Sequence, residues 1–116
     1  MSEYVYKICP RAAWTAACAG GVYSGSPDDA RDGFIHFSFA EQLEATAAKH
    51  FAGQTDLVVI RVPREALGDA LRLEASRGGA LFPHLYGTLA TGLATEVVDL
   101  PWDGTVHVFR ARDVTA

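Results

Sequence analysis

The chain has 116 residues, 49% of them hydrophobic, and carries a formal net charge of −4 at pH 7. This length fits a single domain over residues 1–116 with one hydrophobic core, and the composition is that of a globular chain. The acidic balance offers no general attraction for a nucleic-acid backbone, although a few cations at a cleft could still bind one phosphate group. No segment is long and apolar enough for a membrane span, and no secretion signal is evident, so we expect a cytoplasmic protein.

The first twenty residues predict a strand followed by a helix. Residues 4–8 alternate β-prone side chains and stop before Pro10, which cannot donate to a strand ladder. Residues 12–19 are mostly alanine, the strongest helix former, and a pair of glycines follows, which is typical of a helix end. We expect Trp14 to anchor this helix to the sheet.

A loop and a second strand are predicted next. Residues 23–33 are dense in Gly, Ser, Pro and Asp, which favour turns, and the loop is long enough to carry function. A strand is predicted over 34–39, with Phe34, His36 and Ser38 on one face, because side chains alternate across a strand. The other face is entirely apolar and is expected to face the core.

A second main helix is predicted over 41–51. Apolar residues at four-residue intervals mark its buried face, and Gly53 is expected to end it. Ser38, with Glu41 three residues later, matches the capping box that commonly begins a helix. We therefore predict that this helix packs on the sheet.

The second half of the chain predicts strands with little helix between them. Residues 57–62 form a nearly continuous β-branched run, typical of a central strand covered on both faces. Further strands are predicted at 71–74, 86–89, 96–100 and 106–110, with one helical turn at 64–67 and a hairpin turn at 102–105. Short strands with two substantial helices favour an α+β domain over a doubly wound one.

Two histidines are the strongest candidates for chemistry. His36 is either a half-buried imidazole bonded to a backbone carbonyl, or part of a functional face with Ser38 and Phe34. His84 lies in the segment Phe82-Pro83-His84-Leu85-Tyr86-Gly87, where a proline fixes the backbone and a glycine permits a close approach. That rigidity suits a binding histidine, but the same flanks would equally well close the edge of a core.

Three other polar side chains have simple explanations as well as functional ones. Glu74 could orient a histidine or bind a ribose hydroxyl, yet glutamates at strand ends are commonly only solvated. His50 stands at the end of a predicted helix, where the helix macrodipole favours it. His107 lies in the last predicted strand, and neither of these two histidines requires a ligand.

The sequence predicts neither a metal site nor a reactive cysteine. His36 and His84 have no third ligand at a diagnostic spacing, whereas zinc sites use three or four protein groups. Cys9 and Cys18 form no C-x-x-C motif, and neither lies in an electropositive turn that would activate a thiol.

Several of these segments together resemble the uncharacterised bacterial family DUF952. The resemblance rests on these residues and motifs, in chain order: Tyr6-Lys7-Ile8, Trp14, Gly25-Ser26, Asp32-Gly33-Phe34-Ile35-His36-Phe37-Ser38, Glu74 and Phe82-Pro83-His84-Leu85-Tyr86-Gly87. It extends over nearly the whole chain, and the two histidine segments are specific in both residues and order. The family brings no established activity with it.

DUF952 is grouped by fold with the ADP-ribosyltransferases, and the arrangement resembles the catalytic half of RNA 2′-phosphotransferases, which act on a 2′-phosphate using NAD. The resemblance implies a bent, split, mostly antiparallel sheet around an NAD-shaped cleft, with His36 on the ligand side. Lys7 stands where the transferases hold the histidine that contacts the nicotinamide ribose. A lysine cannot replace a neutral imidazole, but it suits a phosphate or a carboxylate.

The resemblance leads to the hypothesis of a transferase-like enzyme acting on NAD or another nucleotide or phosphorylated small molecule, without a metal. The expected catalytic residues are His36, His84 and Glu74, and the expected ligand contacts are Tyr6, Lys7, Trp14, Ser26, Phe34, Ser38 and Tyr86. In this hypothesis Lys7 meets the phosphate, aromatic side chains stack on the ligand, and the histidines transfer or orient protons. A second hypothesis is a non-catalytic nucleotide- or metabolite-binding module, and a third is a purely structural protein.

Overall fold

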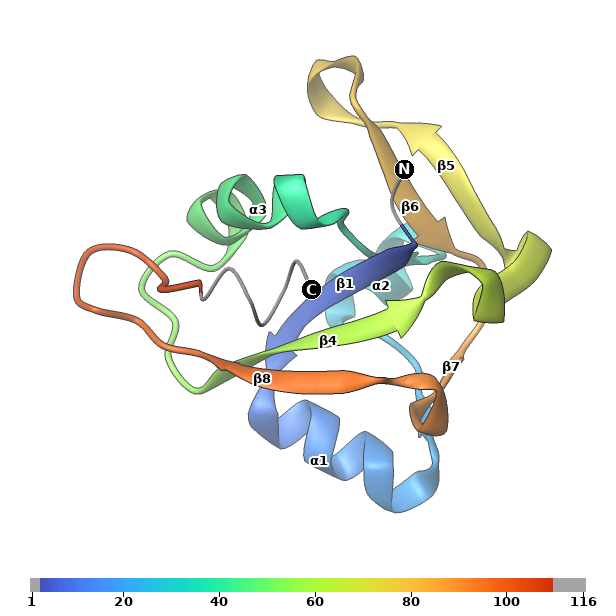
Figure 1. Ribbon diagram of the computed structural model, residues 1–116, viewed down its shortest axis with the longest axis horizontal. Coiled ribbons are helices and arrows are strands. Elements are labelled where there is room, and N and C mark those ends of the chain that lie inside the picture. The colour runs from blue at the N-terminus through green and yellow to red at the C-terminus, as the bar shows by residue number, and fades with distance from the viewer. Residues whose placement is uncertain (1–2, 110–116) are drawn as a thin grey trace.

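A three-stranded antiparallel sheet lies at the centre of the computed structural model, which describes residues 3–109 (Figure 1). Its strands are β1 (Tyr4–Pro10), β4 (Leu57–Pro63) and β8 (Glu96–Leu100), in the order β1-β4-β8. The predicted central strand over 57–62 is confirmed, because β4 pairs with β1 on one side and with β8 on the other.

A second three-stranded antiparallel sheet carries the two histidine segments. It consists of β3 (Ile35–His36), β6 (Leu81–Leu85) and β5 (Leu71–Ala75), in the order β3-β6-β5, while β2 (Val22–Tyr23) and β7 (Leu89–Ala90) form a separate pair. Reciprocal backbone hydrogen bonds of 2.8 Å between Tyr6 and Ser38 connect β1 to the segment after β3. The prediction of a mixed α+β domain with antiparallel strands is therefore confirmed.

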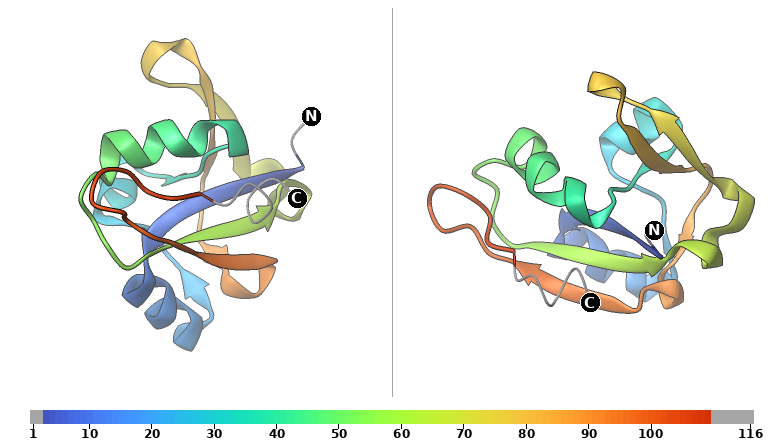
Figure 2. Two further views of the ribbon diagram at one scale, coloured as in Figure 1. Left: turned by 60° about the vertical axis from the view of Figure 1, so that its left-hand side comes forward. Right: turned by 45° about the horizontal axis from the view of Figure 1, so that its top comes forward.

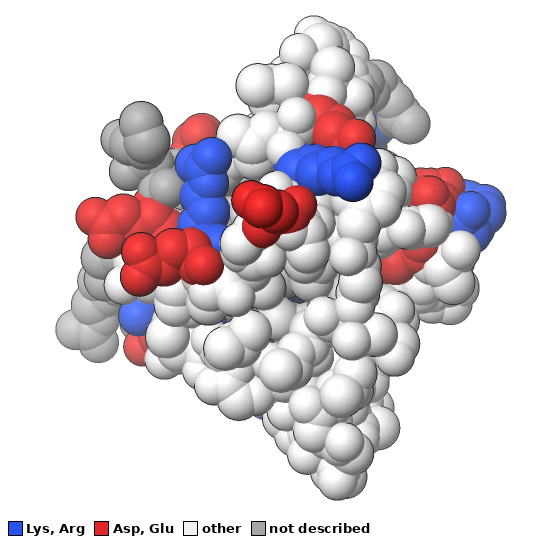
Figure 3. Space-filling model, turned by 90° about the vertical axis from the view of Figure 1, so that its right-hand side faces the viewer, with Lys and Arg blue, Asp and Glu red and all other residues white. Residues whose placement is uncertain are grey.

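The described helices are α1 (Arg11–Gly20), α2 (Pro27–Asp32) and α3 (Leu43–His50), with short 3₁₀ segments at Ala40–Gln42, Arg64–Ala70, Arg77–Gly79 and Thr91–Leu93. The alanine-rich helix α1 ends as predicted, because Gly21 takes a left-handed φ of 80° and donates its N–H to the Cys18 carbonyl. Figure 3 shows that the lower part of one face, where α1 lies, carries few charged side chains. Within residues 3–109, no helix has the length and apolar character needed to cross a membrane.

Alternate residues of β4 enter two hydrophobic clusters on opposite sides of the central sheet. Ile60 packs in the cluster that contains Trp14 of α1, whereas Val59 packs in the cluster that contains Leu43 of α3. All four side chains are buried. Trp14 and the second helix therefore pack against the sheet as predicted. Figure 2 shows α3 and the β5–β6 pair on the same side of that sheet.

The predicted loop over 23–33 is wrong in its second half, where α2 forms. The Ser26 side-chain oxygen accepts a hydrogen bond from the backbone N–H of Asp29, and the Asp29 carboxylate accepts one from the Ser26 N–H. Pro27 begins the helix, at a position where a backbone N–H is not needed. The same residue types favour turns and helix N-termini, so the composition of this segment predicted a loop where a capping box begins a helix.

Two predicted strands of the histidine segments have different bounds in the structure. The strand predicted over 34–39 is reduced to the two residues of β3, and the ladder predicted over 86–89 runs over β6 instead. Pro83 therefore lies inside a strand, although it has no backbone N–H to donate. The structure accommodates it because the Pro83 carbonyl still accepts a hydrogen bond of 2.9 Å from the Phe37 N–H.

In the described part of the last predicted strand, residues 106–109 of 106–110, no strand forms. In the described part of that segment, His107 makes a single antiparallel bridge with Trp102, and Arg110 lies outside the described residues. The turn predicted over 102–105 is present, because the Asp103 carboxylate accepts hydrogen bonds from two backbone N–H groups just after it. The predicted turn is therefore present, but it is followed by a single bridge and not by a paired strand.

The helix predicted over 41–51 begins differently from its predicted cap. The backbone N–H of Phe39 donates to the Gln42 side-chain carbonyl at 2.9 Å, so Gln42 supplies the capping oxygen. The Ser38 hydroxyl instead lies 3.2 Å from the Thr46 hydroxyl, within the body of the helix. Ser38 is thereby turned toward α3 rather than toward the helix start.

Candidate functional site

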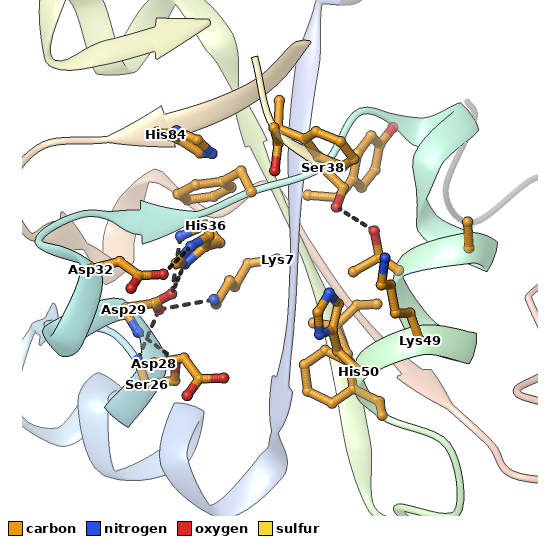
Figure 4. Close-up of a pocket in the computed structure, with 18 of the residues that line it drawn as sticks. Lys7, Ser26, Asp28, Asp29, Asp32, His36, Ser38, Lys49, His50 and His84 are labelled. Carbon is orange, nitrogen blue, oxygen red and sulfur yellow. Dashed lines mark hydrogen bonds and ion pairs between the residues drawn. The ribbon is translucent and has the colours of Figure 1, made fainter. Parts of the chain in front are cut away.

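A cavity of about 450 Å³ lies between α3 and the sheet that carries the histidines, with β1 between the two sides (Figure 4). This volume is within the range of small-molecule sites. Six of the ten predicted site residues line the cavity: Tyr6, Lys7, Ser26, His36, Ser38 and His84. They come from four separate segments of the chain, so the tertiary structure assembles this site.

The register of β3 and β6 places the two histidines side by side. His36 and His84 are direct partners in this antiparallel pair, and their ring centroids are 5.5 Å apart in an edge-on arrangement. Directly opposed residues project on the same face, and a slip of one residue would turn one side chain to the other face. Strand pairing therefore creates the histidine pair.

Asp29 of α2 holds His36 and Lys7 in place. Its carboxylate accepts hydrogen bonds from the Lys7 Nζ at 2.9 Å, the Ser26 N–H at 2.8 Å, the His36 N–H at 3.1 Å and the His36 Nδ1. The side chain is only 2% exposed. This one buried carboxylate therefore links β1, α2 and β3.

The charge of Asp29 is stabilised despite its burial. Burial would raise the pKa of Asp29, but the hydrogen bond from His36, the Lys7 charge and the Ser26 N–H together hold that pKa far below its ordinary value. The carboxylate also requires a close approach by the preceding loop, because a Cβ at Gly25 would lie 2.8 Å from the Asp29 Cβ. The glycine at position 25 thus makes room for this group.

A second carboxylate, Asp32, faces the other ring nitrogen of His36, with 3.0 Å between Oδ2 and Nε2. The ion-paired Arg31 guanidinium lowers the pKa of Asp32, and His36 contributes in the same direction. Both carboxylates are therefore ionised near neutral pH and can only accept hydrogen bonds. Donation to both at once requires a proton on each nitrogen of the imidazole.

His84 is held by a different carboxylate on the neighbouring strand. The Glu74 Oε1 lies 2.8 Å from the His84 Nδ1 and accepts a 2.7 Å hydrogen bond from the Tyr86 hydroxyl. These hydrogen bonds, His84 first, lower the pKa of Glu74, and the Glu74 partner raises the pKa of Tyr86. An ionised Glu74 accepts only, so the His84 Nδ1 carries the proton and its Nε2 is the basic nitrogen.

Comparison with known families matches residues 8–98 to the model of DUF952, described as a protein of unknown function. The chain belongs to the DUF952 family. The crystal structure of protein CC0527 from Caulobacter crescentus is 49% identical, with a TM-score of 0.88, over 95% of this chain and 96% of that one. The solution NMR structure of CC0527 is 46% identical, with a TM-score of 0.84, over 97% of each chain. No curated protein matches this chain.

Two aromatic residues predicted to contact the ligand of this DUF952 protein lie beside the cavity rather than on its lining. The Phe34 ring stacks on the His84 ring, with 4.0 Å between centroids, and contacts the rings of His36 and Tyr86. One face of the Phe34 ring is covered by the His84 ring, so Phe34 supports the histidine instead of stacking on a ligand with that face. Trp14 belongs to the hydrophobic core and contacts Tyr23 there.

The α3 side of the DUF952 cavity was missed by sequence reasoning. Thr46, Lys49 and His50 line it, and Figure 4 shows Lys49 and His50 across the cavity from His36 and Asp29. Their spacing of three and four residues puts them on one face of a helix, which was the available signal. The signal for Asp29 was the spacing of a capping box, three residues after Ser26.

In the part of this DUF952 chain that the structure describes, no cluster of metal ligands forms and the buried Cys9 thiol is not activated. Among residues 3–109, no three His, Cys, Asp or Glu side chains are grouped so that they could hold a metal ion. Burial raises the pKa of the Cys9 thiol to about 11, which leaves it protonated at neutral pH. The charged and titratable groups of the cavity therefore include imidazoles, carboxylates, two lysine ammonium groups and the Arg31 guanidinium.

Proposed function

We propose that this DUF952 protein is a transferase-like enzyme of ADP-ribosyltransferase-like fold, acting on NAD or another nucleotide or phosphorylated small molecule in the cavity. One observation carries the proposal. Two imidazoles, each held by an ionised carboxylate, face one another on paired strands at the wall of an open cavity. General acid–base catalysis requires a proton donor and a proton acceptor held in fixed positions, and two oriented imidazoles can fill these two roles.

His84 is the proposed proton acceptor. Glu74 fixes its Nδ1–H at 2.8 Å and so leaves the Nε2 lone pair as the basic atom, which is the way a carboxylate orients a catalytic histidine. Phe34 stacked on the ring restricts its rotation. Glu74 acts here as a positioning residue, since it reaches the substrate through His84.

His36 is the proposed donor that polarises the leaving group. Asp29 holds Nδ1 from the buried side, whereas the Nε2 partner Asp32 is about one-third exposed at the rim of the cavity. A ligand oxygen can therefore replace Asp32 on Nε2 without disturbing the buried contact. Ser38 lines the same cavity, and its hydroxyl can bind a hydroxyl of a ribose.

The proposal is tested by turnover. Purified protein is incubated with NAD, and with a panel of nucleotides and phosphorylated metabolites, and products such as free nicotinamide are followed by chromatography and mass spectrometry. We expect a product with the wild type that His84→Gln and His36→Gln abolish, since general acid–base groups contribute about 100-fold or more. His107→Gln is the matched control, because His107 is a histidine away from the cavity and its Nε2 contacts only a backbone carbonyl.

A non-catalytic binding module is the second candidate, and the position of Lys7 favours it. Lys7 stands where the transferases hold a histidine, and its ammonium group is buried against Asp29. A module of this kind would be thermally stabilised by one of the tested compounds without forming any product. Ligand-dependent stabilisation that is lost in His36→Gln, with no turnover, would therefore replace the first proposal by this one.

A further inference from the structure

We infer that the α3 side of the cavity, formed by Thr46, Lys49 and His50, binds the phosphate or pyrophosphate group of the ligand. The inference deepens the proposed function and rests on it for the identity of the cavity as a ligand site. It moves the anion away from Lys7, where the sequence placed it, to the opposite side. The two sides of the cavity differ in charge.

The histidine side of the cavity cannot readily accept an anion. Three carboxylates line it, those of Asp28, Asp29 and Asp32. The lysine and arginine on that side are already paired, Lys7 with Asp29 at 2.9 Å, and Arg31 with Asp28 at 3.2 Å and Asp32 at 3.1 Å. A phosphate there would have to displace a carboxylate from its cation while approaching two others, which Coulomb repulsion opposes.

The α3 side has the opposite character. Its cavity-lining residues include no carboxylate, and Lys49 forms no ion pair among residues 3–109. The Lys49 ammonium group supplies three donors and a full charge, and His50 supplies an imidazole beside it. The hydroxyls of Thr46 and Ser38, 3.2 Å apart, complete a set of donors that suits phosphate oxygens.

This placement fixes the direction of the ligand. Figure 4 shows Lys49 and His50 on one side of the cavity and His36, His84 and the carboxylates on the other. With the phosphate held on α3, the far end of the ligand lies against the two imidazoles. The bond that reacts is therefore in the part of the molecule remote from the anchored phosphate, such as a glycosidic or ester linkage.

The test is a titration of uniformly ¹⁵N-labelled protein with inorganic pyrophosphate at about 20 mM NaCl, where exposed charges are weakly screened. We expect amide shifts centred on residues 46–50, and affinity weakened about fivefold by Lys49→Gln, the size of one partly screened charge contact. Arg31→Gln is the matched control, because Arg31 lines the same cavity, is an exposed residue like Lys49, and its substitution removes the same charge. It should change affinity by less than about twofold.

A second arm separates bound nucleotides from free phosphate. Adenosine monophosphate should lose affinity in Lys49→Gln, whereas adenosine, which has no phosphate, should bind the variant and the wild type equally. The inference is overturned if pyrophosphate shifts centre on α2, if Arg31→Gln weakens binding more than Lys49→Gln, or if pyrophosphate does not bind. Turnover that depends on His84 but not on Lys49 would overturn the inference alone, and Lys49-dependent binding without turnover would overturn only the proposed enzyme.

Discussion

The two imidazole–carboxylate pairs of the cavity look alike but rest on different surroundings. Asp29, which holds His36, is 2% exposed and accepts hydrogen bonds from three segments of the chain. Glu74, which holds His84, is 36% exposed on a strand at the edge of its sheet and accepts hydrogen bonds from two side chains, one in β6 and one just after it. We therefore expect the first pair to contribute strongly to the stability of the fold, and the second to contribute little.

The largest expected difference between the pairs is in stability. Asp29→Asn leaves the buried Lys7 ammonium without its counter-charge, and we expect the free energy of unfolding to fall by about 3 kcal/mol. Glu74→Gln should leave that free energy nearly unchanged. Urea denaturation of both variants at pH 7 measures the contrast, and equal losses in the two would remove the distinction between the pairs.

Thiol reactivity should report the same contrast by another route. Cys18 is exposed, whereas Cys9 is buried with a raised pKa, so Cys9 reacts only after the protein opens. If opening follows stability, Asp29→Asn should speed alkylation of Cys9 about 100-fold, and Glu74→Gln should not change it. The rate at Cys18 is the internal control. Rapid alkylation of Cys9 in the wild type would contradict the buried position.

The pH dependence of stability should carry the signature of Asp29. Its folded pKa is lowered, so its stabilisation is complete above the ordinary carboxyl pKa of about 4 and is lost as the pH falls toward the folded value. Between about pH 4 and pH 2 the wild type should lose up to about 1.4 kcal/mol per pH unit more than Asp29→Asn. Parallel curves for the two proteins would show that Asp29 titrates normally in the fold.

The smallest expected effect is on the Tyr86 phenol. Glu74 raises the pKa of Tyr86, so Glu74→Gln should lower that pKa toward its ordinary value of about 10. NMR titration of the Tyr86 ring carbon measures the change, and Asp29→Asn serves as the control that leaves it in place. An unchanged Tyr86 titration in Glu74→Gln would mean that the hydrogen bond between these side chains does not persist in solution.

Sequence reasoning succeeded where the signal was local. The β-branched run over 57–62 predicted the central strand, and the alanine-rich run that ends at two glycines predicted α1. It failed where two local signals competed. Turn-forming residues pointed to a loop where the capping box of α2 forms, and the strand predicted over 86–89 lies earlier in the chain, as β6.

The candidate site was predicted only in part for the same reason. His36 and His84 stood out because polar residues in apolar segments are unusual, and the structure brings them together. Asp29 and Lys49 did not stand out, because an aspartate in a turn-rich segment and a lysine on a helix are ordinary. Their importance comes from what they face, and one sequence cannot show that.

The sequence alone determined the class of fold, the DUF952 resemblance and the two histidine segments, because periodicity, helix ends and motif order are properties of neighbouring residues. The tertiary structure decided which groups meet. Lys7 is 22 residues from Asp29 and could have faced a ligand, but the ion pair formed because an unpaired buried charge is far more costly than a paired one. Burial and strand register, which depend on the whole chain, therefore set the chemistry of this cavity.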